Sequence, residues 1–357
     1  MRALLCKQLG NPLTKEAEKK PLKVVDDHPS PALPANGVRI LVTAAGFNFA
    51  DVLQVQGQYQ ERPKLPFIPG SEVSGRVMEV GRDVRTVKVG DMVCGVTNGG
   101  AFAEECVIRE SSVWVLPAGV DVLAAAGLPV AFGTAHVALE ERAQVKPGQT
   151  VLILGAAGGV GIAAVQIAKL LGAKVVAVVR GQHKAEVVRQ LGADKVVDTS
   201  QAPQPPVASP SGRHTQAQPP PPLRALIKAA APQGVDVVVD MVGGAPFAEA
   251  LKTVRWGAQI LLIGFASGSI PKIAANVALV KNLTFHGIFW GSYTLHRPRV
   301  LRQSLEQLVQ WLAEGRIVVP ISHKVPLDRA PDAFKAMMSR EVVGKVLLLP
   351  GLPQARL

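Results

Sequence analysis

The chain has 357 residues, 48% of them hydrophobic, with 34 glycines and 28 prolines, which suits two globular domains of α/β type. Its formal net charge of +12 comes from scattered Lys and Arg, without the basic block or aromatic platform typical of nucleic-acid binding, and favours an anionic small molecule as ligand. The three cysteines lack metal-ligand spacing and are too few for a disulfide scaffold. No apolar run is long enough to cross a membrane. A strand pattern close to Met1 predicts no signal or transit peptide.

Short strands and turns are expected first, over residues 1 to about 126, where Val38–Val42 is the clearest strand. Apolar runs and helical patterns then alternate from Thr150 to Trp290, as in a parallel sheet with helices on both faces. The strands predicted in this region are Val151–Leu154, Lys174–Val179, Lys195–Val197, Val235–Val239, Gln259–Ile263 and Leu283–Phe289. Helices are predicted at Ile162–Leu171, Lys184–Leu191 and Val300–Ala313.

This order predicts the α/β fold class, with a doubly wound parallel-sheet (Rossmann) coenzyme domain over residues 127–299. Residues 1–126 and 300–357 would together form a second, mostly β domain. One segment interrupts the coenzyme domain, because residues 199–222 are rich in Pro, Gln, Ala and Ser. Such a composition buries little apolar surface, and it predicts a disordered surface insertion.

A phosphate-binding turn follows the strand Val151–Leu154 and leads into a helix. Its predicted cofactor-binding residues are Ala156, Ala157, Gly158, Gly159, Val160 and Gly161. Gly158 would let the backbone approach a pyrophosphate, and Gly161 would let the helix pack closely on the strand. The helix N-terminus would offer free N–H groups and a partial positive charge to the phosphates. The turn therefore predicts dinucleotide binding.

The residues after the second strand of this domain indicate which dinucleotide is bound. In NAD-binding proteins a carboxylate near the end of that strand holds the ribose hydroxyls. Val179 occupies the position here, and Arg180 and Lys184 follow it. A carboxylate would repel a 2′-phosphate, whereas the two cations would attract it. We therefore expect NADPH as the cofactor.

The chain resembles the medium-chain dehydrogenase/reductase superfamily over nearly its whole length, through this turn and the segments Gly46–Asp51 and Pro69–Glu72. The resemblance implies that the mostly β domain is GroES-like. In zinc-containing members these segments hold a Cys and a His ligand, where this chain has Asn48 and Ser71, and no Cys stands near Val130–Phe132 for the third ligand. The lobe that holds a second zinc by four cysteines is also missing, so no metal is expected.

Among zinc-free members the chain is most similar to the NADPH:quinone oxidoreductases, the zeta-crystallin-like family. The resemblance implies hydride transfer from NADPH to a quinone or related conjugated carbonyl, in a cleft between the two domains. Asn48 and Tyr59 would stabilise the developing oxyanion, with a proton from Tyr59 or water. It also implies catalytic positions at Asp51 and Thr134, and further cofactor contacts at Thr199, Gly264, Phe265, Phe289, Gly344 and Lys345.

Simpler structural explanations exist for three of these residues. Asn48 could cap or turn the chain after the strand Val38–Val42. Tyr59 could be a surface aromatic residue in a Gln-rich loop. Thr134 could be the N-cap of a helix that runs through Leu139.

Other functions and partners fit the same sequence. An NADPH-dependent alkenal or enoyl-thioester reductase would use the same hydride chemistry, and a non-catalytic NADPH- and RNA-binding protein would suit the basic charge. The apolar strand over residues 283–290 is expected to end the sheet and to pair with a second subunit in a homodimer. We expect a cytoplasmic location, although the C-terminal Ala355-Arg356-Leu357 resembles a peroxisomal address.

Overall fold

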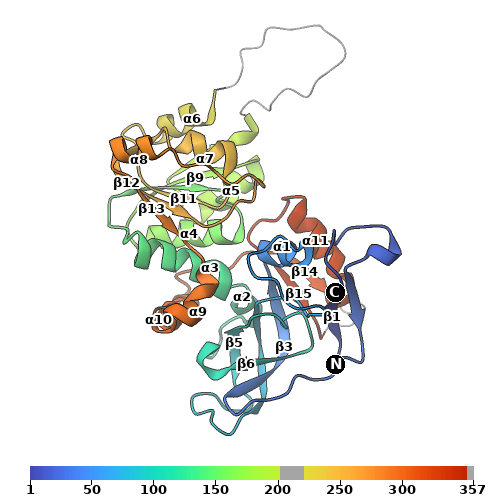
Figure 1. Ribbon diagram of the computed structural model, residues 1–357. Coiled ribbons are helices and arrows are strands. Elements are labelled where there is room, and N and C mark those ends of the chain that lie inside the picture. The colour runs from blue at the N-terminus through green and yellow to red at the C-terminus, as the bar shows by residue number, and fades with distance from the viewer. Residues whose placement is uncertain (202–220, 352–357) are drawn as a thin grey trace. The chain divides into compact units, whose positions relative to one another are not determined.

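The computed structural model describes residues 1–201 and 221–351, which form two compact units (Figure 1). Unit 1 comprises Met1–Val137 and the chain from Trp290 onward, and unit 2 comprises Ala138–Phe289. The helix over Pro129–His136 thus packs within unit 1. The domain boundaries expected from the sequence, near residues 126 and 300, remain a prediction.

Unit 2 is built on a six-stranded parallel sheet in the order β10-β9-β8-β11-β12-β13. The strands are β8 (Thr150–Leu154), β9 (Lys174–Val179), β10 (Lys195–Asp198), β11 (Val235–Asp240), β12 (Val254–Leu262) and β13 (Thr284–Gly287). The order reverses between β8 and β11, so the first strand of the fold lies in the centre, as in doubly wound nucleotide-binding sheets. The predicted fold class is confirmed for this unit.

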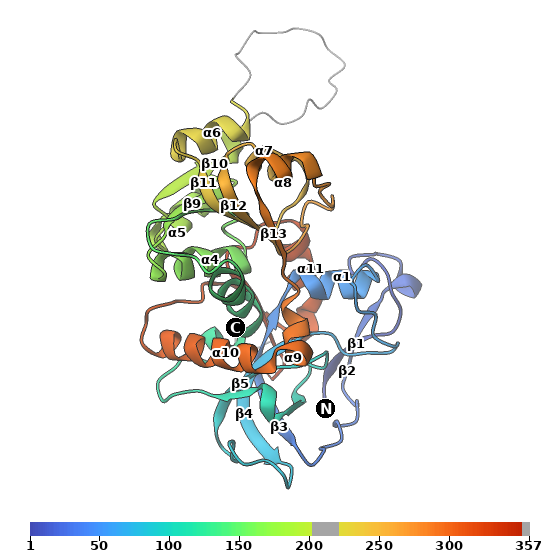
Figure 2. The same ribbon diagram turned by 60° about the vertical axis from the view of Figure 1, so that its left-hand side comes forward.

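Helices cover both faces of this sheet, as Figures 1 and 2 show. The covering helices are α4 (Gly159–Leu170), α5 (Gln182–Gln190), α6 (Leu223–Ala230), α7 (Gly244–Ala250) and α8 (Ala275–Lys281), and the chain of this unit also forms η3 (Val137–Arg142) and η4 (Thr199–Gln201). Leu152 and Leu154 of β8 share a buried cluster with Ile227 of α6 and Phe247 of α7. Because side chains alternate along a strand, the equally buried Ile153 faces the opposite side, where α4 contacts β8 and β9.

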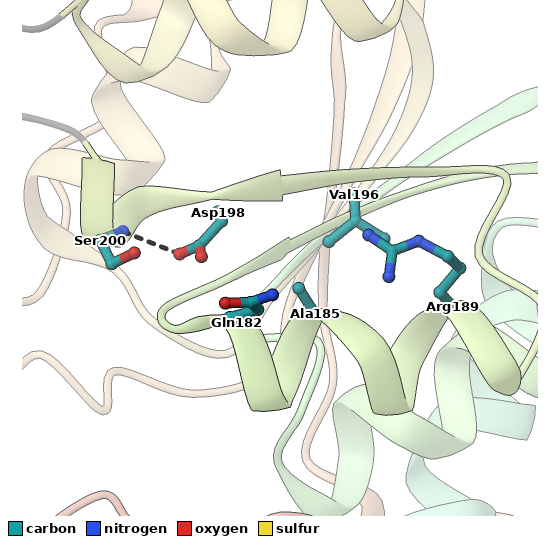
Figure 3. A pocket seen from close by; sticks show the side chains of 6 residues that line it. All are labelled: Gln182, Ala185, Arg189, Val196, Asp198 and Ser200. Atoms are coloured by element: carbon teal, nitrogen blue, oxygen red, sulfur yellow. Dashed lines mark hydrogen bonds between the residues drawn. The ribbon is translucent and has the colours of Figure 1, made fainter.

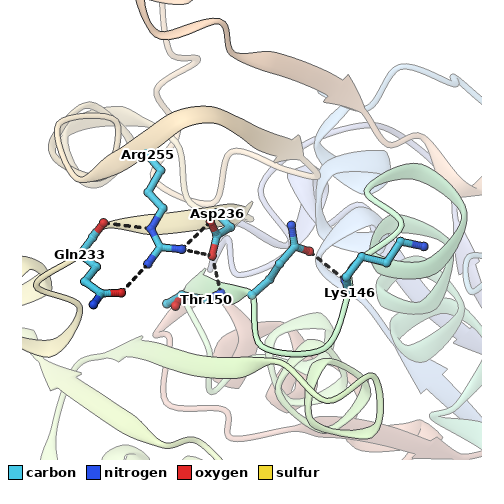
Figure 4. Close-up of polar contacts among 6 residues, drawn as sticks. Lys146, Thr150, Gln233, Asp236 and Arg255 are labelled. Atoms are coloured by element: carbon cyan, nitrogen blue, oxygen red, sulfur yellow. Dashed lines mark hydrogen bonds and ion pairs between the residues drawn. The ribbon is translucent and has the colours of Figure 1, made fainter.

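A polar network ties three strands together at their amino ends (Figure 4). Asp236 at the start of β11 accepts a hydrogen bond from the Thr150 backbone N–H of β8 at 2.7 Å. Arg255 of β12 donates to both Asp236 carboxylate oxygens at 2.8 and 2.9 Å, and its Nε donates to the carbonyl of Gln233. The network lies at the edge opposite to the carboxyl ends of the strands, where the phosphate-binding turn is found.

Unit 1 contains a seven-stranded sheet and a separate two-stranded sheet formed by β1 (Ala3–Cys6) and β2 (Leu22–Val25). The large sheet runs β14-β15-β3-β4-β5-β7, and β6 pairs with β3. Its strands are β3 (Gly37–Phe47), β4 (Glu72–Val80), β5 (Met92–Val96), β6 (Glu105–Arg109), β7 (Val113–Val115), β14 (Ile321–Pro326) and β15 (Lys345–Leu349). The N- and C-terminal parts of the chain therefore share one sheet, and the expected mostly β architecture is confirmed.

Helices and turns complete unit 1. They are η1 (Ala17–Lys19), α1 (Phe49–Gln56), η2 (Glu110–Ser112), α2 (Val122–Ala126), α3 (Pro129–His136), η5 (Trp290–Ser292), α9 (Tyr293–His296), α10 (Pro298–Ala313), η6 (Leu327–Arg329) and α11 (Ala330–Met338). The core joins distant parts of the chain, since the ring of Phe47 stacks on Phe102 and meets Phe334 edge to face, with centroids 5.6 and 4.7 Å apart. This packing fixes the end of β3, where the site described below begins.

Two expectations from the sequence need correction, and two others lie outside the described residues. β13 ends at Gly287, because the chain then enters the turn η5, and it does not extend to Phe289. Thr134 is not a helix N-cap, since α3 already begins at Pro129, a residue favoured in the first helical turn. The predicted insertion lies largely in residues 202–220, and the C-terminal tripeptide in 352–357, both outside the described residues. Within the described part of the chain, no helix has the length and apolar character that spanning a bilayer demands.

Candidate active site

The turn between β8 and α4 has the geometry of a phosphate-binding loop. Gly155 adopts a φ of +75°, in the left-handed region that glycine favours. A Cβ added to Gly161 would lie 2.4 Å from the Gly155 carbonyl oxygen and 2.7 Å from the backbone of Ala156, so the helix can pack this closely only with glycine there. At Gly158 the nearest atom to an added Cβ is the Gly155 oxygen at 3.6 Å, which leaves open space above the N-cap of α4.

The other predicted cofactor-binding residues of unit 2 follow the carboxyl ends of its parallel strands. Arg180 and Lys184 come after β9, Thr199 after β10, Gly264 and Phe265 after β12, and Phe289 after β13. Since the strands are parallel, these ends meet at one edge of the sheet, the edge that carries the turn after β8. The fold therefore places residues spread over more than a hundred positions of sequence along one edge of the sheet.

The segment after β9 is held in place by β10. The Gly181 and Ser200 backbone N–H groups donate to Asp198 Oδ1 at 2.7 and 2.8 Å. Burial alone would raise the pKa of Asp198, but these two N–H groups reverse the effect and lower the pKa, so the carboxylate stays charged. Thr199 donates its hydroxyl to the Val179 carbonyl at 3.1 Å, and the exposed Arg180 follows directly on the chain.

A pocket of about 360 Å³ lies beside this segment, between α5 and the end of β10 (Figure 3). It is lined by Gln182, Ala185, Arg189, Val196, Asp198 and Ser200. None of the predicted cofactor residues is among them. The pocket adjoins the segment that carries Arg180 and Lys184, because Gln182 and Ala185 of that segment line it.

In unit 1 the pairing of three strands assembles a buried polar cluster. Phe47 at the end of β3 pairs with Val346 of β15, and Gly46 pairs with Glu72 of β4 on the other side. Asn48 follows directly after β3 and Lys345 begins β15, so both lie at the same end of the sheet. Residues 48, 72 and 345 are thereby neighbours although 297 positions separate the first from the last.

We call this group of three residues (Asn48, Glu72 and Lys345) the Asn48 cluster. Its ammonium and its carboxylate are both fully hydrogen-bonded. The Lys345 ammonium donates to Asn48 Oδ1 at 2.7 Å, to Glu72 Oε1 at 2.8 Å and to the Phe47 carbonyl at 3.3 Å. Glu72 Oε1 also accepts from Asn48 Nδ2 at 2.8 Å, and Oε2 accepts from the Val130 N–H at 2.8 Å. The side chains of Lys345 and Glu72 are only 3% and 0% exposed, so this is an ion pair removed from water.

Asp51 lies beside the cluster on the first turn of α1. Asn48 is the N-cap residue of this helix, and Asp51 Oδ2 accepts from its backbone N–H at 2.7 Å, as in a capping box. The other oxygen, Oδ1, is buried and has no hydrogen-bond partner among the described residues. Burial raises the pKa of the Asp51 carboxyl to about 7, against the lowering influence of the Asn48 N–H and the Lys345 ammonium.

Tyr59 and Thr134 lie in the same unit. Burial, with the nearby carboxylates of Glu61 and Asp51, raises the pKa of Tyr59, so its hydroxyl keeps its proton at neutral pH. Thr134 is buried on α3 one turn beyond Val130, whose N–H binds the cluster, and positions four apart share a helix face. Unit 1 thus holds the four predicted catalytic residues, Asn48, Asp51, Tyr59 and Thr134.

The structure also shows what sequence reasoning missed. Glu72 is the anion of the cluster, yet the sequence drew attention only to its neighbour Ser71. Lys345 was expected to contact the cofactor, but its ammonium donates all three hydrogens to acceptors within the protein. The available signal was a charged residue at the start of a buried stretch of strand: Lys345 begins the otherwise apolar β15, and Glu72 begins the buried first half of β4. Gly344 has a φ of +80° and an added Cβ would lie 2.2 Å from the Pro320 oxygen, so glycine serves the backbone there.

Residues that could bind a metal do not converge in the described parts of the chain. Across residues 1–201 and 221–351, no three His, Cys, Asp or Glu side chains group closely enough to hold an ion. Cys6, Cys94 and Cys106 are all buried, and burial raises the pKa of each thiol, to about 11 for Cys6 and about 12 for the other two. Such thiols are poor nucleophiles and poor metal ligands at neutral pH.

Comparison with known proteins matches both parts of the chain. Residues 34–118 match the family described as "Alcohol dehydrogenase GroES-like domain", and residues 159–314 match "Zinc-binding dehydrogenase". Quinone oxidoreductase-like protein 2 of Bos taurus is 40% identical over 348 residues, covering 97% of this chain and 92% of the relative.

Two solved structures share the fold over their full length. The Escherichia coli quinone oxidoreductase complexed with NADPH has a TM-score of 0.83 and 26% identity, covering 98% of this chain and 100% of that one. A mycobacterial protein complexed with NADPH has a TM-score of 0.84 and 28% identity with the same coverage. With a parallel coenzyme-type sheet, a GroES-like sheet and these similarities, the chain belongs to the medium-chain dehydrogenase/reductase superfamily, among its quinone oxidoreductase-like members.

Proposed function

We propose that this protein is an NADPH-dependent oxidoreductase that transfers a hydride to a quinone or a related conjugated carbonyl without a zinc ion. The observation that carries the proposal is the turn after β8, where Gly161 permits close packing and Gly158 leaves open space over the helix N-terminus. The names of the relatives, and the NADPH in two of the similar structures, support the cofactor and the substrate class.

The residues of unit 2 fit the cofactor. The N–H groups at the start of α4 would bind the pyrophosphate, and Gly158 leaves room for it. Arg180 and Lys184 would attract the 2′-phosphate. One oxygen of the nearby Asp198 carboxylate already accepts hydrogen bonds from the Gly181 and Ser200 N–H groups. Bound NADPH supplies the hydride.

The residues of unit 1 fit the substrate oxygen. Asn48 is half-buried and would donate an N–H to the oxygen as it gains negative charge. Tyr59, whose raised pKa keeps it protonated, would donate the proton that converts this oxygen to a hydroxyl. Asp51, with a pKa of about 7, would serve as the proton reserve behind Tyr59. Hydride and proton together complete a two-electron reduction.

Zinc independence is part of the proposal. Asn48 and Ser71 stand where the family resemblance places two metal ligands, and no Cys stands near Val130–Phe132 for the third. The Lys345 ammonium lies within hydrogen-bond distance of Asn48, and a positive charge in that position opposes the binding of a second cation.

A panel of NADPH-oxidation assays tests this function. We expect turnover with 1,4-benzoquinone and 9,10-phenanthrenequinone, a preference for NADPH over NADH, and no loss of rate with a chelator. Turnover with an alkenal or an enoyl-CoA but not with a quinone would instead support a C=C reductase, and inhibition by the chelator would contradict zinc independence. Arg180→Ala and Lys184→Ala should each weaken NADPH binding roughly tenfold and leave NADH binding unchanged.

The same protein is proposed to form a homodimer. Among the described strands, β13 lies at the end of the sheet and pairs with β12 alone. On the neighbouring α8, Leu279 and Val280 are 80% and 75% exposed, so apolar surface accompanies the open strand edge. Light scattering should give a dimer mass for the wild type and a monomer for Val280→Arg; a wild-type monomer would contradict the proposal.

A further inference from the structure

We propose that Lys345 and Glu72 are positioning residues that fix the side-chain amide of Asn48 in one orientation, with one N–H left for the substrate. The inference rests on the proposed function, because it concerns the group that would hold the substrate oxygen. It assigns Lys345 a place in the reaction different from the cofactor contact expected from sequence.

The hydrogen bonds of the amide determine its orientation. Oδ1 of Asn48 accepts from the Lys345 ammonium at 2.7 Å, and Nδ2 donates to Glu72 Oε1 at 2.8 Å. Turning the amide over would place its NH₂ group against an ammonium and its carbonyl oxygen against a carboxylate. Both contacts would be repulsive in a buried environment, so the two charges hold the amide from opposite sides.

One hydrogen of the amide remains available. Nδ2 carries two hydrogens, of which one bonds to Glu72, and the second has no acceptor within residues 1–201 and 221–351. Asn48 is half-buried, whereas both charged partners are almost completely buried. The exposed part of the cluster is therefore a single neutral donor backed by an ion pair, and the ammonium on Oδ1 polarises that donor toward a developing negative charge.

The backbone around the cluster is shaped for the ion pair. A Cβ added to Gly46 would lie 2.3 Å from Glu72 Oε1, and one added to Gly127 would lie 3.0 Å from Cγ of Lys345. Glycine at these two positions therefore leaves the space that the charged side chains occupy. Glu72 is fixed further by the Val130 N–H on its second oxygen. A buried pair with every hydrogen bond satisfied is rigid, which suits a group that must hold a neighbour in place.

The test is a double-mutant cycle with Lys345→Met and Asn48→Ala, and Lys324→Met as the matched control. Lys324 is exposed on the neighbouring strand β14, so the control removes the same charge outside the cluster. We expect each cycle variant to lower kcat for quinone reduction about 100-fold with little change in NADPH affinity. The double variant should lose no more than either single one, because Lys345 acts through Asn48. The control should keep wild-type kcat.

A second measurement needs no activity. The protein has six asparagines, so selective ¹⁵N labelling gives six side-chain amide pairs, and Asn48→Ala identifies the pair of interest. In the wild type the hydrogen bonded to Glu72 should exchange with solvent more slowly than the other hydrogen on the same nitrogen, and in Lys345→Met the pair should shift and this difference should shrink. If Lys345→Met does not fold, Glu72→Gln/Lys345→Met takes its place, because that variant leaves no uncompensated buried charge.

The outcomes separate the two claims. If the wild type reduces no quinone, the proposed function fails. The amide signals still decide whether Lys345 and Glu72 hold the Asn48 amide in one orientation. If the wild type is active and Lys345→Met matches it, or if the losses in the cycle are additive, Lys345 does not act through Asn48. An unchanged Asn48 amide pair in Lys345→Met would overturn the positioning role directly.

Discussion

The dinucleotide turn of unit 2 and the Asn48 cluster of unit 1 use opposite means to prepare a site. The turn is built from backbone N–H groups and glycines, and its useful feature is open space above Gly158. The cluster is built from side chains that are mutually hydrogen-bonded and buried, and one amide hydrogen is what it offers. A phosphate spreads its charge over several oxygens and is bound by several backbone N–H groups, whereas a single developing oxyanion needs one well-oriented donor.

Both regions nevertheless depend on a glycine that a methyl group would disturb. Gly161 allows the backbone of α4 to approach β8, and Gly46 allows the Glu72 carboxylate to lie against β3. Substitutions at these positions should therefore have separate consequences, on cofactor affinity in one unit and on turnover in the other.

The largest effect is expected from Gly161→Ala. The added Cβ would lie 2.4 Å from the Gly155 oxygen, so the turn or the helix must shift and the phosphate donors move with it. NADPH affinity, measured by fluorescence titration, should fall by more than about 100-fold. Gly291→Ala is the control, because an added Cβ there meets no atom within 4 Å. Unchanged affinity in Gly161→Ala would mean that this turn does not bind the cofactor.

Gly158→Ala also tests whether the turn after β8 binds NADPH, and it should leave the fold undisturbed. The methyl group would extend into open space, with its nearest neighbour 3.6 Å away, and would occupy the volume assigned to the pyrophosphate. We expect a loss of NADPH affinity of about 100-fold with a melting temperature close to wild type. If the melting temperature fell in step with affinity, the position would be structural.

Gly46→Ala is the counterpart in unit 1. Its Cβ would lie 2.3 Å from Glu72 Oε1 and 2.5 Å from the Ala126 oxygen, which displaces the carboxylate that orients Asn48. Turnover with quinone should fall about tenfold or more while NADPH affinity stays within twofold of wild type. Stopped-flow measurement of NADPH oxidation checks the rate, and a parallel loss of cofactor affinity would contradict the separation of the two regions.

Asp51→Asn should change how stability depends on pH. The Asp51 pKa is about 7 in the folded protein against 3.8 for an unperturbed carboxyl, so the folded state holds a proton that the unfolded state has released. Stability should therefore fall as pH rises from about 4 to 7 and level off above that, by on the order of a few kcal/mol in total. Urea unfolding across this range should show the slope in the wild type and a weaker slope in Asp51→Asn. Identical slopes would mean that Asp51 is not protonated in the native state.

Asp236→Ala gives the smallest effect and serves as a reference outside both regions. It removes the hydrogen bonds to Thr150 N–H and Arg255 that tie the amino ends of three strands (Figure 4). The free energy of unfolding should fall by about 2 kcal/mol. NADPH affinity and kcat of the folded protein should not change, since the network lies at the opposite edge of the sheet; a change in either would show coupling between the two edges.

The contrast between the dinucleotide turn and the Asn48 cluster also explains which features of the structure could be predicted from the sequence. Strand β9 was predicted residue for residue, because an unbroken apolar run, Val175–Val179, follows Lys174 between turns. Strand β12 begins five residues before the predicted Gln259, since Trp256 and Gly257 resemble a turn and the register with β11 shifts there. Local patterns of this kind report backbone conformation well, and the phosphate-binding turn is such a pattern.

The Asn48 cluster could not be read in the same way. Its members come from the end of β3, the start of β4 and the start of β15, and only strand pairing brings them together. Asn48 was proposed from the resemblance to known proteins, but neither its two charged partners nor its orientation follows from the local sequence. The predicted catalytic and cofactor-binding assignments remain predictions, to be settled by the variants above.

The place of β10 has a practical consequence for engineering. It is the outermost strand of its sheet, paired only with β9 among the described strands, and the chain leaves it at η4 and returns at α6. The length of this connection can change without moving a paired strand, which explains how a long segment came to be accommodated here. A reporter domain inserted between η4 and α6 should therefore leave the paired strands of this sheet in place.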